Sequence, residues 1–256
     1  MVLPRSAGRG GASASPFPRG YGMSSLTGQK RGIEVHAPAG VVCPGSTDPA
    51  AWNAYFESLY QDAAGDVSRI PWGDERACPA LVAWLNREAA SVIRPGASVM
   101  VVGCGLGDDV NELAARGYDA IAFDVSPTAV QWARKRHPSL AERFMVADLL
   151  NPPTGLLRRA DLVVEINTVQ SVHPSLRERA VAAIAALARP RGAVLVICRG
   201  RAEAEPLPEH PPFPLSPAEV TTLFGAHGMT ATRSIDDFVD DEVPAKRRLR
   251  ATFRRG

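Results

Sequence analysis

The sequence lacks several features that would point to a simple class of protein. Its four cysteines form no C-x-x-C pair, so neither a zinc site nor a disulfide framework is indicated. No apolar run approaches the ~18 residues that span a bilayer. The 29 basic and 27 acidic residues leave a net charge of only +2. We therefore expect a cytoplasmic protein with no metal, no membrane association and no nucleic-acid partner.

The first 45 residues differ in composition from the rest. Up to Arg31 there are five basic residues and no acidic one, and Gly, Ser and Pro are frequent. Such a segment cannot bury enough apolar surface to offset its ordering entropy. Residues 1–45 are thus predicted to be a disordered tail, and residues 46–256 a single α/β domain. An Arg-rich, acid-poor start is also typical of a transit peptide, although no amphipathic helix accompanies it and Met23 offers another start.

The most informative stretch runs from Ser98 to Asp109. The apolar run Val99–Val102 predicts a buried strand, and it is followed by Gly103, Gly105 and Gly107. A strand, a glycine turn and a helix together present backbone N–H groups to a ligand. The glycine spacing differs from that of dinucleotide sites, and two aspartates at the helix start would repel a pyrophosphate. An adenosine that carries an amino-acid tail fits this turn better.

Two acidic strand ends follow at the spacing that such a ligand requires. A second strand is predicted over 120–124, and Asp124 comes 19 residues after Gly105. A carboxylate at that place can accept both hydroxyls of a ribose. A third strand over 144–146 leads to Asp148, which is suited to an adenine amino group.

With these residues in place, the chain resembles the class I S-adenosylmethionine-dependent methyltransferases. The matching segments are 101–110, 122–129 and 147–149. Upstream, Ile70-Pro-Trp-Gly-Asp74 is similar to the Pro-Trp-Asp segment of the thiopurine, thiol and halide methyltransferase group. Thiopurine methyltransferases carry an Asp-Arg pair after the fourth strand. Here that place reads Glu165-Ile166-Asn167, so the family's substrate is not carried over.

The resemblance implies a Rossmann-like, doubly wound and mostly parallel sheet of seven strands. It also implies a C-terminal antiparallel hairpin, an N-terminal helical lid over 49–61, and a monomer that acts on a small-molecule acceptor. The cofactor would be S-adenosylmethionine, and the residues expected to bind it are Trp52, Trp72, Gly103, Cys104, Gly105, Asp109, Asp124, Val125, Asp148, Leu149 and Glu165. Two of these have a second interpretation. The stripe that includes Trp52 can simply pack on the core, and Glu165 either holds the ammonium of the cofactor or is paired within the fold.

Two further segments are expected near the acceptor. Five prolines between 206 and 214 forbid a helix and stiffen a loop that leaves the end of the predicted fifth strand, 193–198, as a cover for the acceptor or as an inert surface loop. The hairpin strands 230–239 and 248–254 place acidic residues opposite an Arg-rich strand. We interpret that pairing as a solvated edge that neutralises itself rather than as a nucleic-acid surface.

Methyl transfer from a sulfonium is an in-line displacement, so the enzyme mainly supplies positioning and a dry pocket. His173, just past the predicted fourth strand, is the candidate general base, with a capping or solvated histidine as the alternative, and His210 is a weaker candidate. A thiol needs little more than deprotonation, so it is the acceptor we expect first. Oxygen or nitrogen acceptors, a nucleic-acid or protein methyltransferase, and a catalytically silent cofactor-binding module remain as alternatives.

Overall fold

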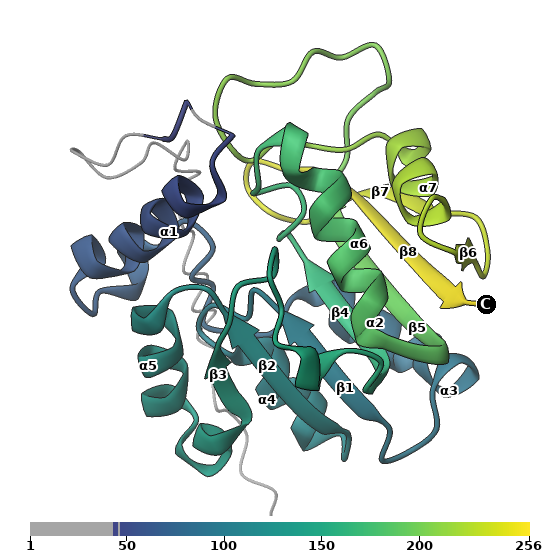
Figure 1. Cartoon of the computed structure of the whole chain (residues 1–256), viewed down its shortest axis with the longest axis horizontal. Coiled ribbons are helices and arrows are strands. Elements are labelled where there is room, and N and C mark those ends of the chain that lie inside the picture. Colours follow the sequence, from purple (N-terminus) through teal and green to yellow (C-terminus); the bar gives the residue numbers. More distant parts are fainter. Residues whose placement is uncertain (1–42, 46) are drawn as a thin grey trace, which may run out of the picture. The chain divides into compact units, whose positions relative to one another are not determined.

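The chain is described by a computed structural model over residues 43–45 and 47–256 (Figure 1). The tail predicted for residues 1–45 therefore lies outside the described residues except at its last three positions. From residue 47 on, the chain forms an α/β domain, as the sequence predicts. Helices alternate with strands up to the fifth strand, and the chain ends in antiparallel strands.

An eight-stranded sheet forms the centre of the domain. Its strands follow the order β3-β2-β1-β4-β5-β8-β6, and β7 also pairs with β8. The first five strands are parallel, whereas β8 runs antiparallel to β5, β6 and β7. The strands are β1 (Ser98–Val102), β2 (Asp119–Asp124), β3 (Phe144–Val146), β4 (Ala160–Ile166), β5 (Ala188–Arg199), β6 (Met229–Ala231), β7 (Asp236–Val239) and β8 (Arg247–Arg255).

The sheet has one strand more than predicted, because the strand expected over 230–239 is two strands. β6 pairs with the end of β8 and β7 with its beginning; Thr232 still donates its N–H to the Thr252 C=O, and residues 233–235 then interrupt the pairing. The predicted fold class is confirmed, since the parallel order reverses between β1 and β4. In such sheets a ligand binds outside the carboxyl ends of the strands at this reversal.

Helices cover both faces of the sheet (Figure 1). Successive strand residues point to opposite faces, so Met100 packs with α6 and α7 in one core, and Val101 packs with α2, α4 and α5 in another. The helices are α1 (Pro49–Ala63), α2 (Pro79–Arg87), α3 (Ala89–Val92), α4 (Asp108–Ala115), α5 (Pro127–Arg136), α6 (Arg177–Leu187) and α7 (Pro217–Gly225). Among the helices of the described part of the chain, none is long and apolar enough to cross a membrane.

Helix α1 is held against the start of α5 by Glu57. Its carboxylate accepts hydrogen bonds from the Ser126 and Thr128 hydroxyls at 2.6 and 2.7 Å and from the Thr128 N–H at 3.2 Å. A carboxylate is favoured there because the first N–H groups of a helix lack internal partners. Although burial acts to raise it, hydrogen bonds from these two residues lower the pKa of Glu57. The carboxylate therefore stays charged at neutral pH and fixes α1 over the sheet edge.

Candidate functional site

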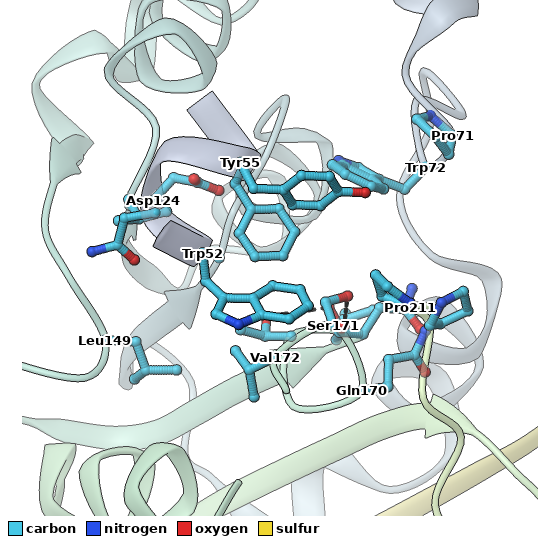
Figure 2. Close-up of a pocket in the computed structure, with 18 of the residues that line it drawn as sticks. Trp52, Tyr55, Pro71, Trp72, Asp124, Leu149, Gln170, Ser171, Val172 and Pro211 are labelled. Carbon is cyan, nitrogen blue, oxygen red and sulfur yellow. Dashed lines mark hydrogen bonds between the residues drawn. The ribbon is translucent and has the colours of Figure 1, made fainter. Parts of the chain in front are cut away.

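A cavity lies at the carboxyl ends of the parallel strands, beneath α1. Its walls come from α1, the glycine turn, the ends of β2, β4 and β5, the segment after β3, the proline loop and the turn between β7 and β8. In Figure 2, Asp124 lies on the left and Gln170 and Pro211 on the right, with the rings of Trp52 and Tyr55 between them. The cavity thus has two ends, one at β2 and β3 and the other at β5 and β8.

Asp124 organises the first end, called the cofactor end below. One carboxylate oxygen accepts the Gly105 N–H and the other accepts the Ser126 N–H, both at 2.9 Å. Burial raises the pKa of Asp124, and these two N–H groups counteract part of the rise. Each carboxylate oxygen has a second lone pair. Asp124 can therefore accept two ribose hydroxyls while it keeps the glycine turn in place.

The glycine turn needs its glycines for two separate reasons. Gly103 has φ +61°, and a Cβ there would lie 2.5 Å from the Oγ1 of Thr168, the residue that bonds the end of β1. Gly105 has φ +51°, and a Cβ there would meet the Tyr60 hydroxyl at 3.1 Å. Both conformations favour glycine. Because these positions carry no side chain, the backbone of the turn can lie closer to a ligand at the end of β1 than it could with any residue other than glycine.

Asp148 forms the far wall of the cofactor end. One of its oxygens accepts the Leu150 N–H at 2.8 Å, and the other accepts the side-chain amide of Asn53 at 3.3 Å. Asn53 belongs to α1, so the lid reaches the residue expected to receive the adenine amino group. Val125 and Leu149 also line this end.

Aromatic residues of α1 and of the Pro71-Trp72 segment form the roof. Trp52 is 1% exposed and makes edge contacts with Tyr55 and Phe213 at 5.8 and 6.2 Å between ring centres. Trp72 is 37% exposed, and its indole N–H donates to the Tyr60 hydroxyl at 2.7 Å. Both tryptophans line the cavity. Trp52 also belongs to the main core, which agrees with the interpretation that its stripe packs on the core; that it binds the cofactor stays a prediction.

The other end, called the acceptor end below, carries positive charge. Arg199 ends β5, and Lys246 and Arg248 lie at the start of β8. Lys246 pairs with Glu242, while Arg248 bonds Asp240 at 2.7 Å and Glu242 at 2.6 Å. Other walls of this end are Asn167, Gln170, Ser171, Pro211 and Pro212. The proline loop therefore does border the cavity.

The structure brings seven of the predicted cofactor residues to the cavity wall: Trp52, Trp72, Gly103, Asp124, Val125, Asp148 and Leu149. Gly105 lies directly behind them through its bond to Asp124. Cys104 packs toward the opposite core, and Asp109 accepts the Cys78 N–H at 2.7 Å, so both lie outside the lining. Burial raises the pKa of Asp109 to about 6.

Glu165 is fully buried at the end of β4, beneath the cavity. Its Oε1 accepts the Val169 N–H at 2.9 Å, and its Oε2 has no hydrogen-bond partner among the described residues. Burial raises the pKa of Glu165 to about 7, and the Val169 and Thr168 N–H groups oppose this rise. The side chain thus supports the loop after β4. Glu165 itself lies outside the cavity lining, which its neighbour Ile166 reaches.

His173 does not line the cavity. Its Nδ1 accepts the Ser175 N–H at 3.2 Å and lies 2.8 Å from the Ser175 hydroxyl, so it caps the 3₁₀ turn Pro174–Leu176. Its ring packs between Trp52 and Phe213, each 6.1 Å away. The capping alternative therefore describes this histidine, and the general-base hypothesis has no support from the geometry. His210 is likewise outside the lining.

Sequence reasoning missed Asn53 and the cations of the acceptor end. The Arg-rich strand is only in part the solvated edge that the sequence predicts: Arg247 bonds Asp237 at the surface, whereas Arg250 is buried and bonds Asp236 and the Ala80 C=O. Arg248 instead turns toward the cavity. Within residues 43–45 and 47–256, no group of three His, Cys, Asp or Glu side chains is placed to hold a metal ion.

Comparison with known proteins agrees with this geometry. A sequence model of the thiopurine S-methyltransferase family matches residues 66–253. A 2-heptyl-1-hydroxyquinolin-4(1H)-one methyltransferase of Mycobacteroides abscessus is 28% identical over 199 residues, which cover 75% of this chain and 79% of that protein. A magnesium-protoporphyrin O-methyltransferase of Rhodobacter capsulatus is 36% identical over 77 residues, or 29% of this chain and 33% of that protein.

Solved structures show the same fold. The 1,6-didemethyltoxoflavin N1-methyltransferase of Burkholderia thailandensis, solved with S-adenosylhomocysteine, has a TM-score of 0.66 at 22% identity, covering 84% of this chain and 93% of that one. The magnesium protoporphyrin IX methyltransferase of Synechocystis PCC 6803, solved with S-adenosylmethionine, has a TM-score of 0.61 at 17% identity, covering 83% and 100%.

Proposed function

This chain belongs to the thiopurine S-methyltransferase family, and we propose that it methylates a small, flat acceptor at a thiol sulfur. It is an S-adenosylmethionine-dependent methyltransferase of a small molecule; the identity of the acceptor atom is the proposal. Bound S-adenosylmethionine supplies the methyl group through its sulfonium. The chain's own residues orient the acceptor and keep water away.

The observation that carries the proposal is the charge of the acceptor end. Three cations lie there, and Glu242, the carboxylate nearest them in the lining, is committed to Lys246 and Arg248. No histidine lines the described cavity. A site with cations and no placed base favours an acceptor that ionises by itself, and a thiol does so far more readily than an alcohol. The aromatic roof of Trp52, Tyr55 and Phe56 suits a flat, soft substrate.

In this proposal the cofactor end binds S-adenosylmethionine. Asp124 receives the ribose hydroxyls, Asp148 the adenine amino group, and the glycine turn lies along the amino-acid tail. The Oε2 of Glu165, which has no hydrogen-bond partner among the described residues, is assigned to the ammonium group in this proposal. We further propose that residues 46–256 are the whole catalytic domain, that residues 1–45 are not needed for it, and that it acts as a cytoplasmic monomer. Support for the dispensable segment comes from its composition, which lacks a core-forming pattern.

An oxygen acceptor is the second candidate. It is favoured by the Mycobacteroides abscessus relative, whose name gives a 1-hydroxyquinolinone as its substrate. The N-hydroxyl of a 1-hydroxyquinolinone is attached to a flat ring, and it loses its proton more readily than the hydroxyl of an alcohol. The same pocket could therefore take either atom, and only turnover distinguishes them.

The test is a matched acceptor panel. We would incubate the protein with S-adenosylmethionine and 4-methylbenzenethiol, 4-methylphenol, 4-methylaniline or 1-hydroxyquinolin-4(1H)-one, and identify methylated products by mass spectrometry. We expect the thiol to react at least tenfold faster than the phenol and the amine. Faster reaction of the hydroxyquinolinone would replace the thiol by an oxygen acceptor. Turnover on none of them would contradict the proposal that the acceptor is a small aromatic.

A further inference from the structure

Arg199 is a cation of the cavity wall without a partner. It is the last residue of β5, and its guanidinium makes no hydrogen bond or ion pair with any residue in the described part of the chain. Burial and the neighbouring Arg248 lower the pKa of Arg199, while the carboxylates of Glu242 and Asp240 raise it without bonding the guanidinium. The five donors of this guanidinium are not among the buried polar atoms that lack a partner, so they are accessible from the cavity to a carboxylate or a phosphate.

The pairing of β5 with β8 makes this cation more conspicuous. Arg199 lies directly opposite Arg248 in the antiparallel ladder. Like charges at such a position destabilise a sheet. Arg248 is neutralised by Asp240 and Glu242, and Glu242 is shared with Lys246. Three cations therefore share two carboxylates, and Arg199 is the cation that bonds neither of them, although both are near enough to raise its pKa.

The backbone around Arg199 is fixed on both sides. Its N–H donates to the side chain of the buried Gln170, and its C=O accepts the Leu215 N–H at 3.0 Å. The C=O of Gln170 in turn accepts the Phe213 N–H at 2.7 Å, which holds the proline loop beside it. The position of Arg199 is thus set by the fold, while its charged group is left to the cavity.

Distance along the sheet separates Arg199 from the methyl donor. Gly103 follows β1, and β4 lies between β1 and β5. Two strand spacings amount to roughly 10 Å. If the methyl donor lies over the glycine turn after β1, a group bound by Arg199 is a different part of the acceptor from the methylated atom.

We propose that Arg199 binds a carboxylate of the acceptor, on the side of the ring opposite to the methylated atom. This inference rests on the proposed function, since it names the class of acceptor for the same site: a flat aromatic thiol that also bears an acid group. Arg199 would bind such a carboxylate through two parallel N–H···O bonds. The guanidinium of Arg199 would then have a bonded carboxylate, which no described residue provides, whereas a neutral acceptor would not bond it in this way.

The test compares 4-mercaptobenzoate with its methyl ester, two thiols that differ in one charge. For the wild-type protein we expect kcat/KM to favour the acid at least tenfold, mainly through a lower KM. Arg199→Gln should reduce this acid-to-ester ratio to near one, and Arg199→Lys should keep part of it. Lys135→Gln removes an exposed positive charge on α5 and should leave the ratio unchanged. Thermal melts show that each variant is folded.

Equal kcat/KM for acid and ester in the wild-type protein, or a ratio that Arg199→Gln does not change, overturns the inference. If no thiol is methylated but 4-hydroxybenzoate or its ester is, the thiol proposal fails on its own. The ratio of those two phenols then tests Arg199 in the same way.

Discussion

The two ends of the cavity differ in how their charges are satisfied. At the cofactor end, Asp124 and Asp148 already hold backbone N–H groups and a lid amide, so the carboxylates are fixed before any ligand arrives. At the acceptor end, Arg199 has no partner among the described residues and faces another arginine. A preformed site suits a cofactor that is the same in every reaction. A cation without a bonded partner, in contrast, discriminates between acceptors, because only an acceptor with a negative group can pair with it.

The strongest way to break this comparison is Asp124→Ala. Two charge-assisted hydrogen bonds to the ribose, ~1.5–3 kcal/mol each, would be lost. The Gly105 and Ser126 N–H groups would also lose their acceptor. We expect the affinity for S-adenosylmethionine to fall at least tenfold in titration calorimetry, together with a lower melting temperature. Asp62→Ala, an exposed change on α1, is the control. Unchanged affinity would refute the ribose assignment.

Glu165→Gln tests the buried carboxylate near the end of β4, which, unlike Asp124 and Asp148, has one oxygen without a hydrogen-bond partner among the described residues. Burial raises the pKa of Glu165 from 4.5 to about 7, so between these values the folded protein holds a proton that the unfolded chain has released. The free energy of unfolding therefore falls as pH rises through this window, by roughly 3 kcal/mol. Denaturant titrations at pH 5 and pH 7.5 should show this fall in the wild type, and a smaller one in Glu165→Gln.

The exposed residue Glu178 supplies the control for this measurement, as Glu178→Gln should keep the wild-type pH dependence. An identical slope in Glu165→Gln and the wild type would show that Glu165 is ionised throughout. A loss of cofactor affinity in Glu165→Gln would support its contact with the ammonium group.

Trp72→Ala tests the roof with a smaller effect. A cation–π contact with the sulfonium contributes ~0.5–2 kcal/mol, so cofactor affinity should fall by about 2- to 30-fold. The loss of stability should be only about 1 kcal/mol, from the Tyr60 hydroxyl that loses its partner. Trp52→Ala is the contrast, because truncation of this buried ring should cost ~3–5 kcal/mol. Thermal melts with and without S-adenosylmethionine separate the two. A large drop for Trp72→Ala with ligand stabilisation preserved would make Trp72 merely structural.

The smallest effect is expected for the N-terminal segment, residues 1–45, whose composition differs from that of the rest of the chain. A chain that begins at Val42 should melt within a few degrees of the full chain, because residues 1–45 lack a core-forming pattern. Differential scanning calorimetry of both proteins checks this. A much lower melting temperature would show that the segment is part of the domain.

The cofactor end could be predicted because its parts are neighbours in the sequence. The strand, the glycine turn and the acidic strand end can each be recognised from a few consecutive residues, and Asp124 is 19 positions from Gly105. The capping box of Ser216 and Glu219 at the start of α7 is equally local, since its two residues are three positions apart. Such local patterns predict structure well because they depend on backbone geometry and not on contacts with distant parts of the chain.

The acceptor end could not be predicted in the same way. Arg199 and Arg248 meet only through the register of β5 and β8, and alternation along a strand does not tell which arginine of a basic run turns inward. The same limit explains His173, whose place after β4 suggested a base but whose ring packs on Trp52. The hydrogen bonds between Glu57 of α1 and the start of α5 also have no sequence signal, because Glu57 and Ser126 are far apart in the sequence.

Trp52 belongs both to the core and to the roof, and this limits how the protein can diverge. A substitution that reshapes the cavity at Trp52 also removes packing from the centre of the domain, so it lowers the free energy of unfolding. Pro211 and Lys246 line the cavity but do not belong to the buried core. The shape of the acceptor end can therefore be changed at these positions at a smaller cost in stability than at Trp52.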